Sequence, residues 1–146
     1  GVDYDSEKIE TARHSFLRRP ETQFIHAALR TSELPESDAF LLLDVLHYMQ
    51  PEEQRGLLER CAARLKAGGR IIIRDGDAGK AERHKTTAMT EVWSTKIVGF
   101  NKTDGELHFT STPELQQTAR RLGLEIHAAH TDAHTSNTVY ILTRPE

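Results

Sequence analysis

Blocks of apolar residues alternate along the chain with amphipathic and polar segments. The continuous apolar run Ala39–Leu43, with an aspartate on each side, predicts a strand over 38–45. A strand that is apolar on both faces is typical of a parallel sheet covered by helices on both sides. Residues 70–75 predict a second buried strand. Shorter strands are predicted at 22–29, 124–129 and 138–143.

Helical periodicity is clearest after Pro51, which suits the first position of a helix. The carboxylates Glu52 and Glu53 occupy its first turn, where the helix dipole favours negative charge. Gly68-Gly69 is expected to end this helix. Its apolar residues fall on one face, which predicts a buried stripe of Leu57, Leu58, Cys61 and Leu65.

Two further helices are predicted over 6–17 and from Pro113 to the closing Gly123. Residues 76–110 hold another helical pattern after a polar stretch, and we expect them to form a lid or substrate-binding insertion. The alternation of strands and helices predicts an α/β fold with a mostly parallel sheet. The last two strands are close enough in sequence to form an antiparallel hairpin. The 146 residues suit one domain.

Composition narrows the class of protein. Hydrophobic residues make up 37% of the chain and charged residues 28%, as in a soluble globular protein. The net charge of -3 gives no basic surface for nucleic acid, and no apolar run is long enough to span a membrane. The single Cys61 cannot form an internal disulfide, so a reducing cytoplasm is expected, with Cys61 as a core residue.

Carboxylates stand where predicted strands end. Asp3 follows the short apolar start of the chain, and a carboxylate in that place can accept hydrogen bonds from both hydroxyls of a ribose. Its alternative role is to stabilise the start of the following helix. Asp44 ends the first buried strand, and Asp75 and Asp77 end the second. Open α/β sheets bind ligands at this edge, so these residues are site candidates.

His47 lies three residues beyond Asp44, and an imidazole has a suitable proton affinity for a general base at neutral pH. The alternative is a partly exposed loop histidine without a chemical role. A metal site is not expected in the other histidine cluster, His127, His130 and His134 with Asp132. His127 and His130 are three apart on a predicted strand and therefore point to opposite faces.

Three segments in this order resemble class I S-adenosylmethionine-dependent methyltransferases. They are Gly1-Val2-Asp3-Tyr4-Asp5, residues 38–49, and residues 65–73 with the sequence Leu-Lys-Ala-Gly-Gly-Arg-Ile-Ile-Ile. The resemblance covers nearly the whole chain. It implies a Rossmann-like three-layer sandwich and S-adenosylmethionine as the cofactor.

The resemblance also implies roles for individual residues. Asp3 would hold the ribose and Tyr4 would lie against the adenine. The other implied cofactor contacts are Ala28, Leu29, Asp44 and Val45. The implied substrate contacts are His47, Tyr48, Asp77 and Arg83, and the candidates for the catalytic residue are His47, Asp75 and His84. Residues 74–77, 83–84, 94–96 and 99–103 resemble the methyltransferase segment of some large bacterial proteins that carry exporter and lipid acyltransferase parts.

The chain departs from the family in two places. Ala28 stands where the family usually has an aspartate for the adenine amino group. The glycine-rich loop that follows the family's first strand has no counterpart, and we expect that strand to be missing. The second and fourth strands of the family would then flank a gap about one strand, roughly 5 Å, wide. We expect this gap to be filled by direct pairing of the two strands, a partner chain or a swapped element.

Two functions remain open from the sequence. The first is methyl transfer from S-adenosylmethionine to a small-molecule or lipid-like acceptor by a longer protein from which this chain is a piece, with further domains possible upstream and the piece alone inactive. The second is a non-catalytic, methyltransferase-like scaffold or assembly domain. The missing loop and Ala28 favour the second function, whereas Asp3, Tyr4 and residues 44–48 favour the first.

Overall fold

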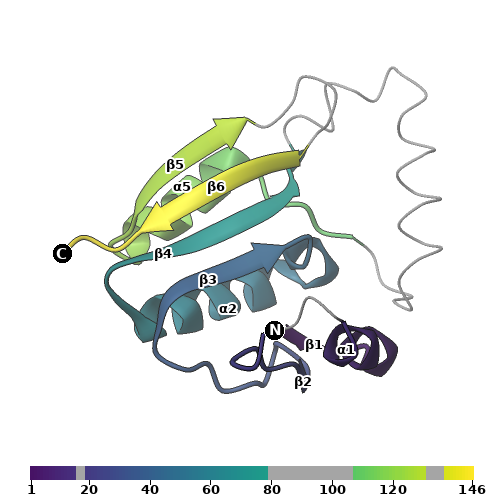
Figure 1. Ribbon diagram of the computed structural model, residues 1–146. Coiled ribbons are helices and arrows are strands. Elements are labelled where there is room, and N and C mark those ends of the chain that lie inside the picture. The colour runs from purple at the N-terminus through teal and green to yellow at the C-terminus, as the bar shows by residue number, and fades with distance from the viewer. Residues whose placement is uncertain (16–18, 79–106, 131–136) are drawn as a thin grey trace. The chain divides into compact units, whose positions relative to one another are not determined.

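The computed structural model describes residues 1–15, 19–78, 107–130 and 137–146. The chain forms two compact units, Gly1–Pro35 and Glu36–Glu146. Figure 1 shows the elements of each unit, and each unit is described by itself. Within the described ranges, none of the helices combines the length and the hydropathy that a membrane crossing requires.

The first unit holds two very short parallel strands and one helix. Strand β1 (Val2–Asp3) pairs with β2 (Ile25–His26), and helix α1 (Ser6–Arg13) follows β1. The side chain of Asp5 caps α1 by accepting hydrogen bonds from the N–H groups of Glu7 and Lys8.

Both predicted elements of this unit are shorter than expected. The helix predicted to reach residue 17 ends at Arg13, and it buries only Ile9. A helix with so little buried surface gains little from each added turn. The strand predicted over 22–29 contains two residues, because its only partner, β1, is equally short.

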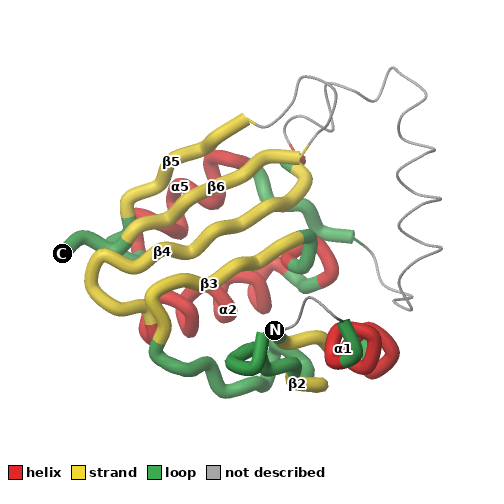
Figure 2. Tube along the Cα trace, viewed as in Figure 1, coloured by secondary structure: helices red, strands yellow, loops and turns green. Residues whose placement is uncertain are grey.

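The second unit is built on a four-stranded sheet with the order β3-β4-β6-β5. Its strands are β3 (Ser37–Leu43), β4 (Leu65–Gly76), β5 (Glu125–His130) and β6 (Asn137–Thr143). Strands β3 and β4 are parallel, whereas β6 runs antiparallel to both β4 and β5. Figure 2 shows these strands side by side in yellow. The α/β class and the antiparallel C-terminal hairpin are confirmed.

Helices α2 (Pro51–Arg64) and α5 (Thr112–Arg121) lie on the same face of this sheet, behind it in Figure 1. The predicted start of α2 at Pro51 is confirmed. Its predicted stripe is also confirmed, because Leu57, Leu58, Cys61 and Leu65 are all at most 3% exposed. Burial raises the pKa of the Cys61 thiol to about 11, so Cys61 is a protonated core residue at neutral pH.

The predicted end of α2 at Gly68-Gly69 is wrong. The helix ends at Arg64, and Leu65 is already the first residue of β4. The two glycines lie within β4 instead. Gly68 has φ +66°, a conformation that favours glycine, and a Cβ on Gly69 would lie 2.8 Å from the carbonyl oxygen of Lys66.

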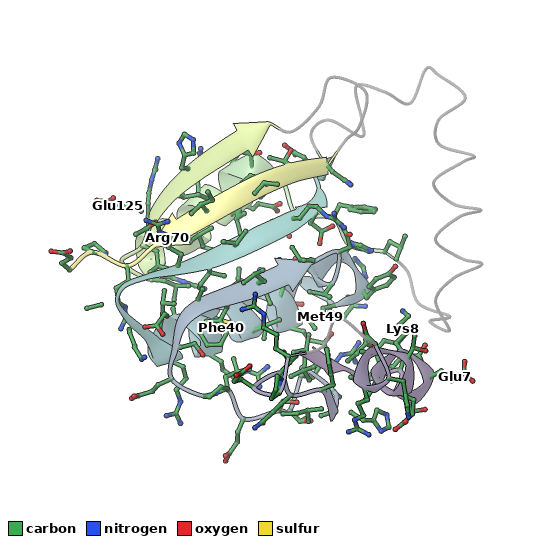
Figure 3. All side chains as sticks on the ribbon, viewed as in Figure 1. Glu7, Lys8, Phe40, Met49, Arg70 and Glu125 are labelled. Carbon is green, nitrogen blue, oxygen red and sulfur yellow. The ribbon has the colours of Figure 1, made fainter. Side chains whose placement is uncertain are left out.

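The expectation that the strand over 38–45 is buried on both faces is also wrong. Leu42 is 5% exposed and faces the helices with its registered neighbour Ile73, whereas Leu41 is 61% exposed and Leu43 is 47% exposed. Leu41 is in register with Ile72, and Ile72 with Ile141, so apolar residues continue across the outer face. Figure 3 shows this sheet with its side chains, including Arg70 and Glu125 of the same outer face. Among the described residues, β3 has β4 as its one hydrogen-bonded neighbour, so β3 is an edge strand.

Candidate active site

Polar side chains gather where β3 and β4 end. Because these strands are parallel and Leu43 is in register with Arg74, their carboxyl ends lie at the same edge of the sheet. Asp44 directly follows β3, and the short 3-10 helix η1 (Leu46–Tyr48) comes next. Asp75 is the residue before the last of β4, and Asp77 directly follows the strand. The sequence therefore brings several of its predicted site residues together here.

His47 and Asp75 form a buried pair at this edge. Nδ1 of His47 lies 2.6 Å from Oδ1 of Asp75, and the two residues are 3% and 7% exposed. The carboxylate also accepts hydrogen bonds from the backbone N–H of His47, at 3.2 Å, and of Gly76, at 2.8 Å. Three such bonds stabilise the ionised form of a carboxylate. Because His47 is buried, the alternative of a partly exposed loop histidine is wrong.

The hydrogen bond to Asp75 decides which nitrogen of His47 carries the proton. A carboxylate oxygen accepts, so Nδ1 is the donor, and in the neutral form of the ring Nε2 carries the lone pair. Nε2 is buried and has no hydrogen-bond partner among the described residues. The ring is held by Tyr48, with centroids 4.1 Å apart, and by Phe109, which stacks on it at 5.1 Å and 25°. A ring held in one orientation in this way meets the geometric requirement for accepting a proton at Nε2.

Asp77 belongs to a second polar cluster that joins β4 to α5 and β6. Its Oδ2 accepts a hydrogen bond of 2.7 Å from the hydroxyl of Thr112, which lies 2.8 Å from the hydroxyl of Tyr140. Burial raises the pKa of the Tyr140 hydroxyl, and the negative charge of Asp77 raises it further. Tyr140 therefore stays protonated. The cluster fixes the carboxylate of Asp77 at the start of α5.

Asp44 has an unusual backbone. Its φ of 54° lies in the left-handed region, where aspartate and asparagine are the most tolerated residues after glycine. Its N–H donates to the carbonyl oxygen of Arg74 at 2.8 Å, and its carboxylate pairs with the guanidinium of Arg74. This bond to Asp44 raises the pKa of Arg74. Val45, the other predicted contact of this segment, is half-buried beside η1.

The predicted nucleoside contacts lie in the first unit. Asp3 ends β1, and its Oδ1 accepts a hydrogen bond of 2.8 Å from the N–H of Asp5. The helix cap is Asp5 rather than Asp3, so the alternative role of Asp3 at the helix start is indirect. Tyr4 is 46% exposed. Ala28 is exposed and Leu29 half-buried in the turn after β2.

Several predicted residues cannot be placed. Arg83, His84 and nearly all of the expected insertion over 76–110 lie outside the described residues, as do Asp132 and His134. His127 is exposed on β5. No group of three or more histidine, cysteine, aspartate or glutamate side chains that could hold a metal occurs in the portions that the structure describes.

A cavity of about 460 Å³ lies between the two helices of the second unit. It is lined by α2, α5 and the segment before α5, including Arg55, Arg121 and Glu114. Phe109 and Gln54 are also part of its wall, whereas Asp44, Asp75 and Asp77 are not. The cavity therefore borders Phe109, which stacks on His47, rather than the carboxyl ends of β3 and β4.

Sequence reasoning missed Gln54, Phe109 and Thr112. Phe109 and Thr112 come from a segment more than 60 residues after His47, and no pattern in the sequence connects them. Gln54 carried a signal, because it is a polar residue on the buried face of α2, three and four positions before Leu57 and Leu58. A polar side chain in such a place is expected to have hydrogen-bond partners in the interior.

Comparison with protein-family profiles identifies one family. The profile of the O-methyltransferase domain matches residues 4–109. An O-methyltransferase family protein from Burkholderia thailandensis is 26% identical, with a TM-score of 0.62, over 84% of this chain and 36% of that protein. No curated protein matches the sequence significantly.

Two more distant structures show the same fold. Human N-acetylserotonin methyltransferase, solved with S-adenosylmethionine, is 18% identical with a TM-score of 0.68 over 97% of this chain and 39% of that one. Magnesium protoporphyrin IX methyltransferase from Synechocystis, solved with S-adenosylhomocysteine, is 15% identical with a TM-score of 0.68 over 99% of this chain and 63% of that one. The chain thus spans between about a third and two thirds of these proteins.

Proposed function

Because the chain belongs to the O-methyltransferase domain family, we propose that the whole protein transfers a methyl group from S-adenosylmethionine to a hydroxyl oxygen of a small-molecule or lipid-like acceptor. The observation that carries this proposal is the His47–Asp75 pair. Its Nε2 is free of partners among the described residues, and its Nδ1 is bound to a carboxylate. An alcohol or phenol acceptor needs a base of this kind, because it loses a proton as its oxygen gains the methyl group.

The residues of the chain account for the proton and for orientation. When bound, the cofactor supplies a methyl group on a sulfonium sulfur, which leaves as the neutral thioether. Nε2 of His47 takes the hydroxyl proton of the acceptor. Asp75 stabilises the resulting imidazolium through Nδ1, and the ring contacts of Tyr48 and Phe109 keep the imidazole in one orientation. Tyr48, Asp77 and Arg83 are proposed to border the acceptor.

The cofactor itself fits the chain only in part. Asp3, at the carboxyl end of β1, is the residue type that holds a ribose, and Tyr4 is exposed beside it. Asp44 and Val45 are proposed to border its methionine end. The sequence has no glycine-rich loop to cradle that end, and Ala28 offers no side-chain acceptor for the adenine. We therefore propose that this chain alone is inactive and that the whole protein completes the site.

Calorimetric titration with S-adenosylhomocysteine tests this division. We expect no measurable binding to the 146-residue chain and clear binding to the whole protein. In the whole protein, Asp3→Ala should weaken binding by about 10- to 100-fold, as expected for the loss of charge-assisted hydrogen bonds. Glu125→Ala is the matched control, because Glu125 is an exposed carboxylate on β5, away from Asp3 in the sequence and without a proposed role. No measurable binding to either the chain or the whole protein would refute the enzyme proposal.

The alternative function is a methyltransferase-like scaffold without catalysis. Two observations favour it, the absent glycine-rich loop and Ala28. The same titration separates the two functions, because a scaffold would not bind S-adenosylhomocysteine even as the whole protein. A scaffold would also have no need for the buried, oriented base at the strand ends.

We further infer that another strand pairs with the free edge of β3. Within the described part of the second unit, β3 is hydrogen-bonded to one strand, β4. An unpaired edge beside exposed Leu41 and Leu43 favours association. For the chain alone, the partner we expect is a second copy. Sedimentation velocity should therefore detect a dimer at micromolar concentration, and a monomer at all concentrations would contradict this inference.

A further inference from the structure

The side chain of Gln54 connects two segments that are more than 50 residues apart. Its Nε2 donates hydrogen bonds to the carbonyl oxygens of Met49, at 3.0 Å, and His108, at 2.7 Å. Its Oε1 accepts a hydrogen bond from the hydroxyl of Thr110. From this arrangement we propose that Gln54 is a positioning residue for His47, a role that rests on the proposed function.

The partners of Gln54 fix the orientation of its amide. Two carbonyl oxygens can only accept, so they require the NH₂ group, and the Thr110 hydroxyl then donates to the amide oxygen. Gln54 is 5% exposed, so water is a poor substitute for it. Removing the amide would leave two buried carbonyl groups and a hydroxyl without this partner, which disfavours the present arrangement of both segments.

Both segments that Gln54 holds also contact His47. Met49 directly follows η1, the short helix that carries His47. On the other side, the N–H of His108 donates to the carbonyl oxygen of His47 at 2.9 Å, and the next residue, Phe109, stacks on the imidazole. Gln54 thus acts on His47 through its neighbours and does not touch the ring itself.

Packing alone does not explain a glutamine at this position. The buried face of α2 otherwise carries Leu57, Leu58, Cys61 and Ala62. An apolar residue of similar length would fill the same space without the cost of burying an amide. What glutamine adds is a connection between η1 and the Phe109 segment. Since small displacements of a reacting group lower rates strongly, this connection matters for a base that must meet an acceptor hydroxyl.

The test is Gln54→Met, which keeps the length of the side chain and removes its hydrogen bonds. Gln117→Met is the matched control, because Gln117 is an exposed glutamine on α5. Nitrogen-15 NMR of the histidine rings in the 146-residue chain reports the tautomer of His47, and the ring-proton shifts report the stacked Phe109. We expect both to change in Gln54→Met and neither to change in Gln117→Met, with native circular dichroism in both.

In the whole protein, Gln54→Met should lower kcat by about 10- to 100-fold, with the KM for the cofactor unchanged. If Gln54→Met does not fold, Thr110→Val is the variant that tests the proposal. It removes only the hydrogen bond from Thr110 to Gln54, so it should shift the His47 signals in the same direction but by a smaller amount. Unchanged His47 signals in a folded Gln54→Met chain would overturn the proposal. Absent methyl transfer by the unaltered whole protein would instead overturn the proposed function, since the NMR readout needs no cofactor or acceptor.

Discussion

His47→Gln is expected to lower the methyl-transfer rate of the whole protein by about 10²- to 10⁴-fold, the usual contribution of a general base. The affinity for S-adenosylmethionine should not change, because the base meets the acceptor rather than the cofactor. Glutamine retains polar atoms near Asp75 but cannot take a proton at neutral pH. Single-turnover kinetics at saturating cofactor measure the chemical step directly.

The matched control is His127→Gln, because His127 is an exposed histidine on β5 of the same sheet. This change should leave the rate within about twofold, as for surface substitutions with little energetic effect. Asp75→Asn should also slow transfer, since the amide keeps an acceptor but loses the charge that stabilises the imidazolium. Residues that act as one unit are not additive, so the double variant should be no slower than His47→Gln. Additive losses would contradict a shared role.

Leu142→Ala is expected to lower the free energy of unfolding by about 2–5 kcal/mol, because it leaves a cavity in a packed core. Leu142 is 0% exposed on the helix-facing side of β6. The same substitution at Leu41, which is 61% exposed on the opposite face of the sheet, should cost less than about 0.5 kcal/mol. The contrast follows from which face of the sheet is covered by α2 and α5.

Urea unfolding followed by far-ultraviolet circular dichroism measures both changes, and equal m-values would show that the two variants expose similar surface on unfolding. The measurement belongs at low protein concentration, where association at the edge of β3 contributes least. A loss at Leu41 as large as that at Leu142 would mean that the outer face is covered by another element or another molecule.

The sequence predicted the elements of this fold better than their ends. The start of α2 at Pro51 and its buried stripe follow from local rules of capping and periodicity. Its end does not, because Gly68-Gly69 suits a helix terminus and also the tight start of β4 that the structure has. Glycine permits both conformations, and tertiary pairing with β3 decides between them.

The exposure of Leu41 and Leu43 could not be predicted from their own segment. A continuous apolar run indicates burial on both faces only if other elements cover both faces of the sheet. In the second unit the described helices cover one face. Which faces are covered depends on elements outside the run.

The sequence predicted only part of the candidate site. His47 and Asp75 each follow from the rule that ligands meet the carboxyl ends of parallel strands, and their pairing follows once β3 and β4 are neighbours. The group that stacks on His47 comes from a distant segment, Phe109. Sequence spacing carries no information about such contacts.

The free edge of β3 also bears on how this chain behaves during its synthesis and purification. Residues 39–43 combine high apolar content with no charge and no proline, and they lie on an edge that has no strand partner in the part of the chain that the structure describes. Such segments join growing β-aggregates unless a charge or a proline interrupts them. Asp38 and Asp44 stand at the two ends of the run, where they act as gatekeepers against stacking of one copy on the next. The yield of soluble chain should therefore fall when these two aspartates are replaced by apolar residues.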